Sequence, residues 1–168
     1  MNREDVNLNR TDLSSFKALT VHREGSFELD MNPDIAFPLF TALGEKLWIS
    51  TWEPFVLHGN GYDEGTIWVT EDEGHRAYWY VAIYDTEKRN ARYVRVTPEV
   101  NSGTVDVCVS SNGSEGTMVT VIYQLTGLSE TGNGQTARML DEDAYARMMG
   151  EWRDMIIQNR DQIDSLTS

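Results

Sequence analysis

The chain has 168 residues, about the length of one domain with a substantial core, and its 27 acidic and 14 basic residues give a formal net charge of −13. Because this charge repels phosphate backbones and anionic lipid surfaces, we expect no nucleic-acid partner. No stretch of about 18 apolar residues occurs, so we expect no membrane insertion, and the single cysteine, Cys108, excludes an internal disulfide and fits a reducing, cytoplasmic location.

The first part of the chain predicts a loose arm followed by one strand. Residues 1–17 are polar and lack a clear period, so we expect a flexible N-terminal arm, followed by a single domain over residues 18–168. Residues 19–31 predict the first strand of that domain, since apolar residues recur there before an Asn-Pro turn. Gly25 is expected to form a bulge or bend within this strand.

Two short helices are predicted after the first strand. Asn32 is suited to cap a helix whose first position is Pro33, since the missing N–H of proline costs nothing there. Pro38 keeps this helix short, and Gly44 begins a second short helical segment that ends before Trp52.

The middle of the chain predicts an antiparallel meander. Turn-forming residues separate five segments with strand character, at residues 66–70, 76–85, 91–97, 104–110 and 117–128. In the second segment, alternation places Ala77, Trp79, Val81 and Ile83 on one face and Tyr78, Tyr80, Ala82 and Tyr84 on the other. Which face of each strand points inward is left open, because a register shift of one residue exchanges the two sets.

One long amphipathic helix is predicted at residues 141–163. Apolar residues recur there at spacings of three and four and form a stripe that is interrupted once, by Asn159. An antiparallel sheet with an apolar face needs a cover, and this helix is the long one available. The pattern therefore indicates an α+β fold.

Several segments carry a resemblance to a known family. They are residues 33–40, 44–48, 52–54, 65–68, 79–85, 93–98 and 120–128. With these segments, the chain resembles an uncharacterised bacterial member of the SRPBCC (START/Bet v 1-like, polyketide cyclase/dehydrase-like) superfamily over about residues 27–163. The resemblance implies a helix-grip fold, in which a seven-stranded antiparallel sheet wraps round a long C-terminal helix, with two short helices after strand one and a cavity for an apolar ligand.

The sequence contains no recognisable catalytic or metal-binding motif. His22, His58 and His75 are far apart and match no metal-ligand spacing, so no metal and no cofactor is expected. Cys108 lies between two valines in a predicted strand and is expected to be a packed thiol rather than a nucleophile. Residues 59–65 are rich in glycine but lack the spacing of a phosphate loop, so they are expected to be a plain loop.

The number of aromatic rings is the remaining signal. The candidates for a ligand cavity share a large or polar side chain on a predicted strand or helix: Phe37, Phe40, Glu45, Trp48, Trp52, Trp68, Trp79, Tyr93, Arg95, Tyr123, Met148 and Trp152. The same rings are also compatible with an ordinary core. Glu45 is singled out as a ligand anchor or, if desolvated, a base, with local pairing as the alternative. Arg95 either holds a ligand carboxylate or neutralises an acidic surface.

Three functions are compatible with these observations. The first, which we favour, is binding or carriage of a hydrophobic small molecule, lipid-, aromatic- or polyketide-like, in an internal cavity. By resemblance alone, the second is a cyclase, aromatase or dehydratase acting on such a ligand. The third is a protein-interaction module of the Hsp90-activator type, whose acidic surface suits a basic partner. A homodimer formed through an edge strand is also compatible with the sequence.

Overall fold

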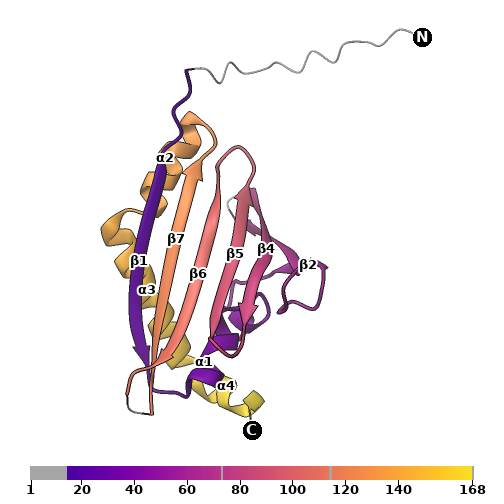
Figure 1. Cartoon of the computed structure of the whole chain (residues 1–168), viewed down its shortest axis with the longest axis vertical. Coiled ribbons are helices and arrows are strands. Elements are labelled where there is room, and N and C mark those ends of the chain that lie inside the picture. The colour runs from indigo at the N-terminus through magenta and orange to yellow at the C-terminus, as the bar shows by residue number, and fades with distance from the viewer. Residues whose placement is uncertain (1–14, 73, 114, 168) are drawn as a thin grey trace, which may run out of the picture.

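The computed structural model of the chain describes residues 15–72, 74–113 and 115–167. These residues form a seven-stranded antiparallel sheet in the order β1-β7-β6-β5-β4-β3-β2, which confirms the predicted fold class (Figure 1). The strands are β1 (Thr20–Leu29), β2 (Phe55–His58), β3 (Ile67–Asp72), β4 (His75–Asp85), β5 (Asn90–Thr97), β6 (Asn101–Ser111) and β7 (Thr117–Gly127).

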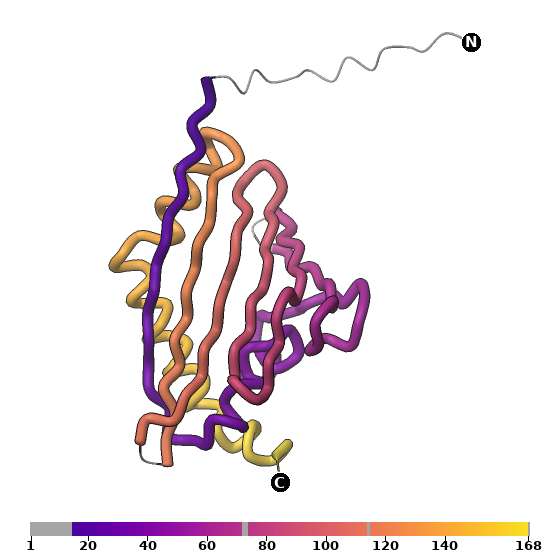
Figure 2. Tube along the Cα trace, in the orientation of Figure 1, coloured from indigo at the N-terminus to yellow at the C-terminus, as the bar shows by residue number. Residues whose placement is uncertain are grey.

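Helices cover one face of the sheet and both of its ends. After β1 come α1 (Pro33–Ala36) and the 3₁₀ helices η1 (Phe37–Phe40) and η2 (Gly44–Leu47). After β7 come α2 (Glu130–Met139), α3 (Glu142–Gln158) and α4 (Arg160–Thr167). Figure 2 shows α2 and α3 descending behind β1 and β7, while α1 and α4 lie together at the opposite end of the sheet. The core lies between α3 and the inner face of the sheet.

The predicted start of α1 is confirmed. The Asn32 side chain accepts a hydrogen bond from the backbone N–H of Asp34 at 2.8 Å, and Pro33 occupies the first helical turn. The helix ends within one turn, because Pro38 follows and the chain tightens into η1.

The C-terminal helix is segmented rather than continuous over residues 141–163. Asp141 caps α3 by accepting a hydrogen bond from the N–H of Ala144 at 3.2 Å. Asn159 ends α3, since its side chain donates to the carbonyl of Met155 at 2.8 Å and so competes with the helical backbone pattern. Helix α4 then begins in a new direction.

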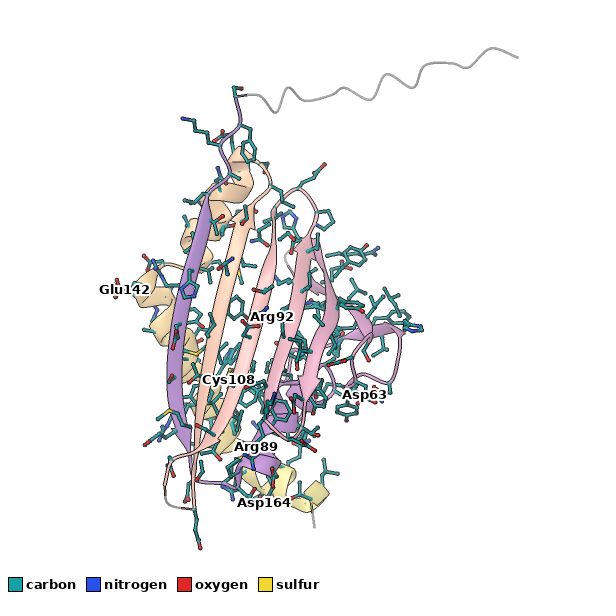
Figure 3. All side chains as sticks on the ribbon, in the orientation of Figure 1. Asp63, Arg89, Arg92, Cys108, Glu142 and Asp164 are labelled. Carbon is teal, nitrogen blue, oxygen red and sulfur yellow. The ribbon has the colours of Figure 1, made fainter. Side chains whose placement is uncertain are left out.

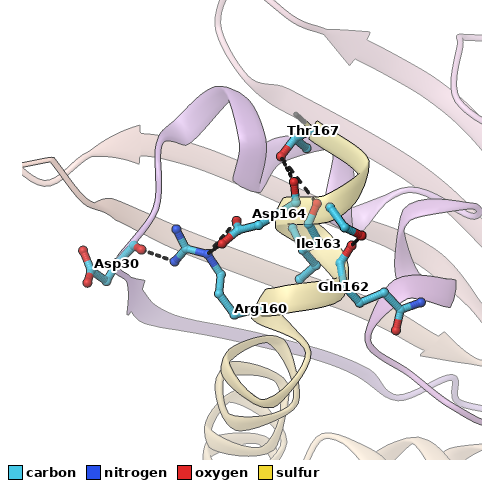
Figure 4. A network of polar contacts seen from close by, with 7 residues as sticks. Asp30, Arg160, Gln162, Ile163, Asp164 and Thr167 are labelled. Carbon is cyan, nitrogen blue, oxygen red and sulfur yellow. Dashed lines mark hydrogen bonds and ion pairs between the residues drawn. The ribbon is translucent and has the colours of Figure 1, made fainter.

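A polar contact connects α4 to the residue that follows β1 (Figure 4). Arg160 forms an ion pair with Asp164 within the helix, at 2.9 Å, and also donates to the backbone carbonyl of Asp30. Ile163 of this helix is fully buried. These contacts close one end of the space between sheet and helices.

A β-bulge changes the inward face of β4. The pairing with β5 runs from Tyr78 to Val81 and shifts before Ile83, so the alternation predicted for this strand holds only up to Val81. Ile83, which was expected beside Trp79, is exposed, and Tyr84 turns inward to stack on Phe37 with ring centroids 4.9 Å apart.

Gly25 does not form the expected bulge. The pairing of β1 with β7 is regular through Gly25, which lies opposite Val121. A Cβ atom at this position would lie 2.7 Å from Cγ of Met149 and 3.0 Å from Cε1 of Tyr145. The glycine therefore lets α3 approach the sheet closely, and close packing rather than backbone bending explains it.

The outer face of the sheet is polar along its centre. Arg92 and Asp106 form a bidentate ion pair there, with a shortest distance of 2.7 Å. Cys108 is two residues after Asp106 on β6 and so lies on the same face; Figure 3 labels Arg92 and Cys108. Burial is the main cause that raises the pKa of the Cys108 thiol above its ordinary value, consistent with an unreactive side chain. Of the predicted arm at residues 1–17, residues 1–14 lie outside the described residues, and Lys17 accepts a hydrogen bond from Asn133.

Candidate functional site

The inward faces of β4 and β5 bring aromatic and polar side chains together. Trp79 lies opposite Arg95, and Val81 lies opposite Tyr93, in the register of the two strands. Tyr93 is 4% exposed, whereas Tyr80, on the other face of β4, is 46% exposed. The inner face of β5 is therefore the polar one, with Tyr93 and Arg95, which resolves the choice that the sequence left open.

A small void lies between the sheet and α3, and we call it the inner void. Its volume is about 20 Å³, room for one water-sized group. Seven of its lining residues are aromatic: Phe40, Trp52, Trp68, Trp79, Tyr93, Tyr123 and Trp152. The remaining ones are Thr41, Glu45, Val105 and Val107. The interior is thus almost filled by rings.

The rings pack on one another in a connected cluster. Trp68 stacks on Trp79 with centroids 5.6 Å apart and planes 2° from parallel, and it meets Tyr93 edge-on at 5.5 Å. Trp52 contacts the edge of Trp79 at 6.4 Å. Because each ring touches the next, the movement of one ring changes the shape of the inner void.

Glu45 is the acidic residue of the inner void. The residue as a whole is half-buried, but its carboxyl group lies among the rings, and burial raises its pKa from 4.5 to about 8. No salt bridge with a described residue stabilises the ionised form. At neutral pH this group is therefore mainly a neutral carboxylic acid, which can donate a hydrogen bond.

The two tyrosines of the inner void stay protonated. Burial raises the pKa of Tyr93 well above its ordinary value, and the neighbouring Glu45 raises it further. Burial also raises the pKa of Tyr123, against an opposing effect of the charge on Arg95. The Tyr93 hydroxyl donates to the backbone carbonyl of Phe40 at 2.8 Å.

One indole in this cluster differs from its neighbours in hydrogen bonding. Trp48, Trp52 and Trp79 donate their indole N–H groups to Leu39 O, Ala42 O and Thr70 Oγ1, respectively, at 2.8 to 3.0 Å. The indole N–H of Trp68, a residue that is 3% exposed, has no hydrogen-bond partner among the described residues. An unmet buried donor of this kind costs about 1–3 kcal/mol.

An open groove, the outer groove, adjoins the inner void. Its volume is about 550 Å³, and it lies between the inner faces of β3 to β6 and helix α2. Trp52 and Trp79 line both spaces, so these two rings separate them. The other residues around the groove are mainly polar: Thr51, Thr70, His75, Ala77, Arg95, Thr97, Val100, Asn101, Gln135, Arg138 and Met139.

Arg95 links the outer groove to α2. Its guanidinium group lies 5.4 Å from the Trp79 ring centroid and donates to Asn101 Oδ1 at 2.9 Å. Asn101, which is 2% exposed, donates in turn to Thr136 Oγ1 of α2 at 3.1 Å. The chain of contacts from Trp79 to Thr136 holds a cationic group at the groove.

The structure brings most of the predicted site residues together. Eight of them line the inner void: Phe40, Glu45, Trp52, Trp68, Trp79, Tyr93, Tyr123 and Trp152. Arg95 lines the outer groove. Trp48 packs behind Trp152 at 5.6 Å, Phe37 stacks on Tyr84, and Met148 packs against the core from α3, so none of these three lines either space.

Several residues that line the inner void or the outer groove were not predicted from the sequence. Val105 and Val107 alternate on the inner face of β6, and this period of two was the available signal for them. Asn101 of the outer groove had no such signal, because it lies outside the predicted strands and its contact with Thr136 spans 35 residues.

The described residues contain no group of three or more His, Cys, Asp or Glu side chains arranged to hold a metal ion. Within that same part of the chain, no helix has both the length and the apolar character needed to cross a membrane. Comparison with family models gave no match, and comparison with curated proteins gave none either.

Solved structures resemble the chain closely in fold and weakly in sequence. Norcoclaurine synthase from Thalictrum flavum matches with a TM-score of 0.61 and 13% identity, over 83% of this chain and 88% of that one. Ginseng major latex-like protein 151 from Panax ginseng matches with a TM-score of 0.62 and 17% identity, over 82% and 95%. Ara h 8.0201 matches with a TM-score of 0.56 and 10% identity, over 83% and 99%. At these identities the likeness shows the fold alone, and the chain has the Bet v 1-like helix-grip fold.

Proposed function

We propose that this protein binds a small hydrophobic molecule that contains an aromatic ring, with the ring in the outer groove and one end directed to the inner void. One observation carries the proposal: Trp52 and Trp79 line both spaces, so an aromatic surface continues from the open groove into the interior. The groove volume of about 550 Å³ is in the range of small-molecule sites.

Binding on this proposal is driven by desolvation of apolar surface and by ring stacking. A ligand ring in the groove gains contact with Trp79, whose own orientation is fixed by its hydrogen bond to Thr70 and by the guanidinium of Arg95. Such a pre-oriented surface lowers the entropy cost of binding.

Access to the inner void requires a ring to move. A space of about 20 Å³ admits one water-sized group, so a larger group has to displace Trp52 or Trp79. Trp52 lies in the segment between η2 and β2, and its side chain is half-buried, with one hydrogen bond to Ala42 O. Trp79 is held within a strand by pairing on both sides. We therefore assign the opening movement to Trp52.

Titration with a simple aromatic ligand tests the proposal. Acetophenone and α-methylstyrene, measured by calorimetry and by the shift in Tm, are expected to bind and to stabilise the protein. Trp79→Leu should weaken binding by about tenfold or more, because it removes the stacking surface. Tyr80→Leu, next to it on the outer face of β4, is the matched control and should bind normally.

Two results contradict the proposal. If neither compound binds at millimolar concentration, the groove is not a site for small aromatic molecules. If both variants bind like the natural protein, the ligand lies elsewhere. Circular dichroism of each variant separates loss of binding from loss of fold.

A specific observation favours a second function, general acid–base exchange of the α-hydrogens of a bound ketone, in which ionised Glu45 takes an α-proton and its acid form returns a proton to the same carbon. Glu45 has a pKa of about 8, near the pH at which general acids and bases act best, and Tyr123 lines the same void. Exchange of the α-hydrogens of 2-tetralone in D₂O, followed by NMR, measures such activity. A rate that Glu45→Gln leaves unchanged argues against it.

A further inference from the structure

One buried hydrogen-bond donor beside the inner void has no partner among the described residues. Thr41 Oγ1 already donates to Pro38 O at 2.7 Å and accepts from the N–H of Gly44 at 2.9 Å. The Tyr93 hydroxyl donates its proton to the backbone carbonyl of Phe40 and so has none left for a ligand. The indole N–H of Trp68 remains without a partner among the described residues, although it is buried. The void therefore has a buried donor with no acceptor in reach.

Two further donors line the same void. Tyr123 is 5% exposed, and its hydroxyl stays protonated. Glu45 contributes a carboxyl group, and burial keeps it in the acid form at neutral pH. The titratable groups that its charge affects are Tyr93 on β5 and Tyr123 on β7, and the cation Arg95 on β5 acts on Tyr123. A neutral carboxylic acid beside a tyrosine is a known arrangement for holding an oxygen atom that carries partial negative charge.

We propose that the inner void receives the carbonyl oxygen of the ring-bearing ligand, bound by the indole N–H of Trp68 and the hydroxyl of Tyr123, with the carboxylic acid of Glu45 as a third donor. This inference rests on the function proposed above and adds the chemical class of the ligand, an aromatic ketone or aldehyde. The size of the void agrees with it, since about 20 Å³ admits one oxygen atom but not the two of a carboxylate.

A matched pair of ligands tests the inference. Acetophenone has a carbonyl oxygen where α-methylstyrene has a methylidene group of similar size, so the two differ mainly in the acceptor. Acetophenone is expected to bind about tenfold more tightly, because its oxygen meets the otherwise unpaired, buried indole N–H of Trp68. Infrared spectroscopy of acetophenone with a ¹³C-labelled carbonyl gives a second readout. The C=O stretching frequency should be lower in the complex than in an apolar solvent, because hydrogen bonds to the oxygen weaken the C=O bond.

Conservative variants identify the donors. Trp68→Phe keeps a ring but removes the N–H, so it should abolish most of the preference for acetophenone, measured as the ratio of the two dissociation constants. Glu45→Gln keeps a donor and should retain the preference. In the natural protein the preference should decrease above about pH 8, as Glu45 ionises, and in Glu45→Gln it should not. Tyr123→Phe provides a second test if Trp68→Phe does not fold.

The outcomes separate this inference from the proposed function. If neither compound binds, the proposed function itself fails. If both bind equally well to the natural protein, the ring site stands and the carbonyl site is refuted. A preference for acetophenone that survives both Trp68→Phe and Tyr123→Phe also refutes it, because the oxygen is then held elsewhere. A carbonyl stretching band that does not shift on binding also refutes the carbonyl site.

Discussion

The buried carboxyl group of Glu45 predicts an unusual dependence of stability on pH. Its pKa rises from 4.5 to about 8 on folding, because the folded protein disfavours the charged form. The unfolded chain therefore loses this proton at lower pH than the folded protein. The folded state binds more protons than the unfolded state between these values, so the free energy of unfolding falls as pH increases from about 4.5 to 8. Below pH 4.5 the stabilisation from the neutral Glu45 carboxyl is fully present, and above about pH 8 it is completely lost.

The magnitude follows from the shift. Each pKa unit corresponds to about 1.4 kcal/mol, so a rise from 4.5 to about 8 gives an upper limit of about 5 kcal/mol. The residue is half-buried, and solvent or a small rearrangement around the carboxylate reduces the cost. We therefore expect a loss of about 2–4 kcal/mol between about pH 5 and pH 8.5.

Urea unfolding of the natural protein and of Glu45→Gln at several pH values measures this loss. Glutamine has a similar shape and no charge, so the difference between the two proteins isolates the titration of Glu45 from that of the other carboxylates. The natural protein should lose stability relative to the variant by the amount above. Glu28→Gln, at an exposed position on β1, is the control for removal of one carboxyl group. A difference between the natural protein and Glu45→Gln that stays constant from about pH 5 to pH 8.5 would refute a buried, uncompensated carboxyl group.

Two further predictions concern stability alone. Gly25→Ala should destabilise the protein by about 1–2 kcal/mol, because its Cβ would lie 2.7 Å from Cγ of Met149, whereas Gly150→Ala, with no atom within 4 Å of the added Cβ, should stabilise α3 by about 0.5–1 kcal/mol. Equal effects of the two substitutions in urea unfolding would contradict the packing role of Gly25. Asp141→Ala should cost about 1 kcal/mol through loss of the cap on the N–H of Ala144, and Asp141→Asn should restore most of it, as thermal unfolding would show. No recovery with asparagine would argue against a capping role.

Two elements, β2 and α2, were not predicted from the sequence, and each has a physical reason. Strand β2 is a short edge strand in which Phe55 and Leu57 are 66% and 52% exposed and only Val56 packs against the core, so four residues give too little inward pattern to detect. Helix α2 contains Gly132 and Gly134, which have poor helix propensity, and packing against β7 stabilises it. The signal that could have revealed α2 was Ser129, whose hydroxyl caps it by accepting from the N–H of Gly132 at 2.9 Å.

The composition of the site was more predictable than its arrangement. Trp68, Trp79, Tyr93 and Tyr123 were selected as large aromatic side chains in strands, and all four line the inner void. The bulge in β4 exchanged Ile83 for Tyr84 on the inner face, and no local pattern announced it. A bulge depends on the pairing of two strands, so a single strand carries little sign of it.

Local chemistry in the sequence determined where six of the seven strands lie, where α1 and α3 begin, and that aromatic residues would be concentrated on the sheet, because alternation, proline and capping side chains act over a few residues. Only the tertiary structure decided that Glu45 lies among rings and that the indole N–H of Trp68 lacks a partner. It also decided that the interior space is about 20 Å³ and the adjoining groove about 550 Å³. Those properties depend on how η2, five strands and α3 pack against one another, and desolvation of a carboxyl group is the sum of all those contacts rather than a property of its neighbours in sequence.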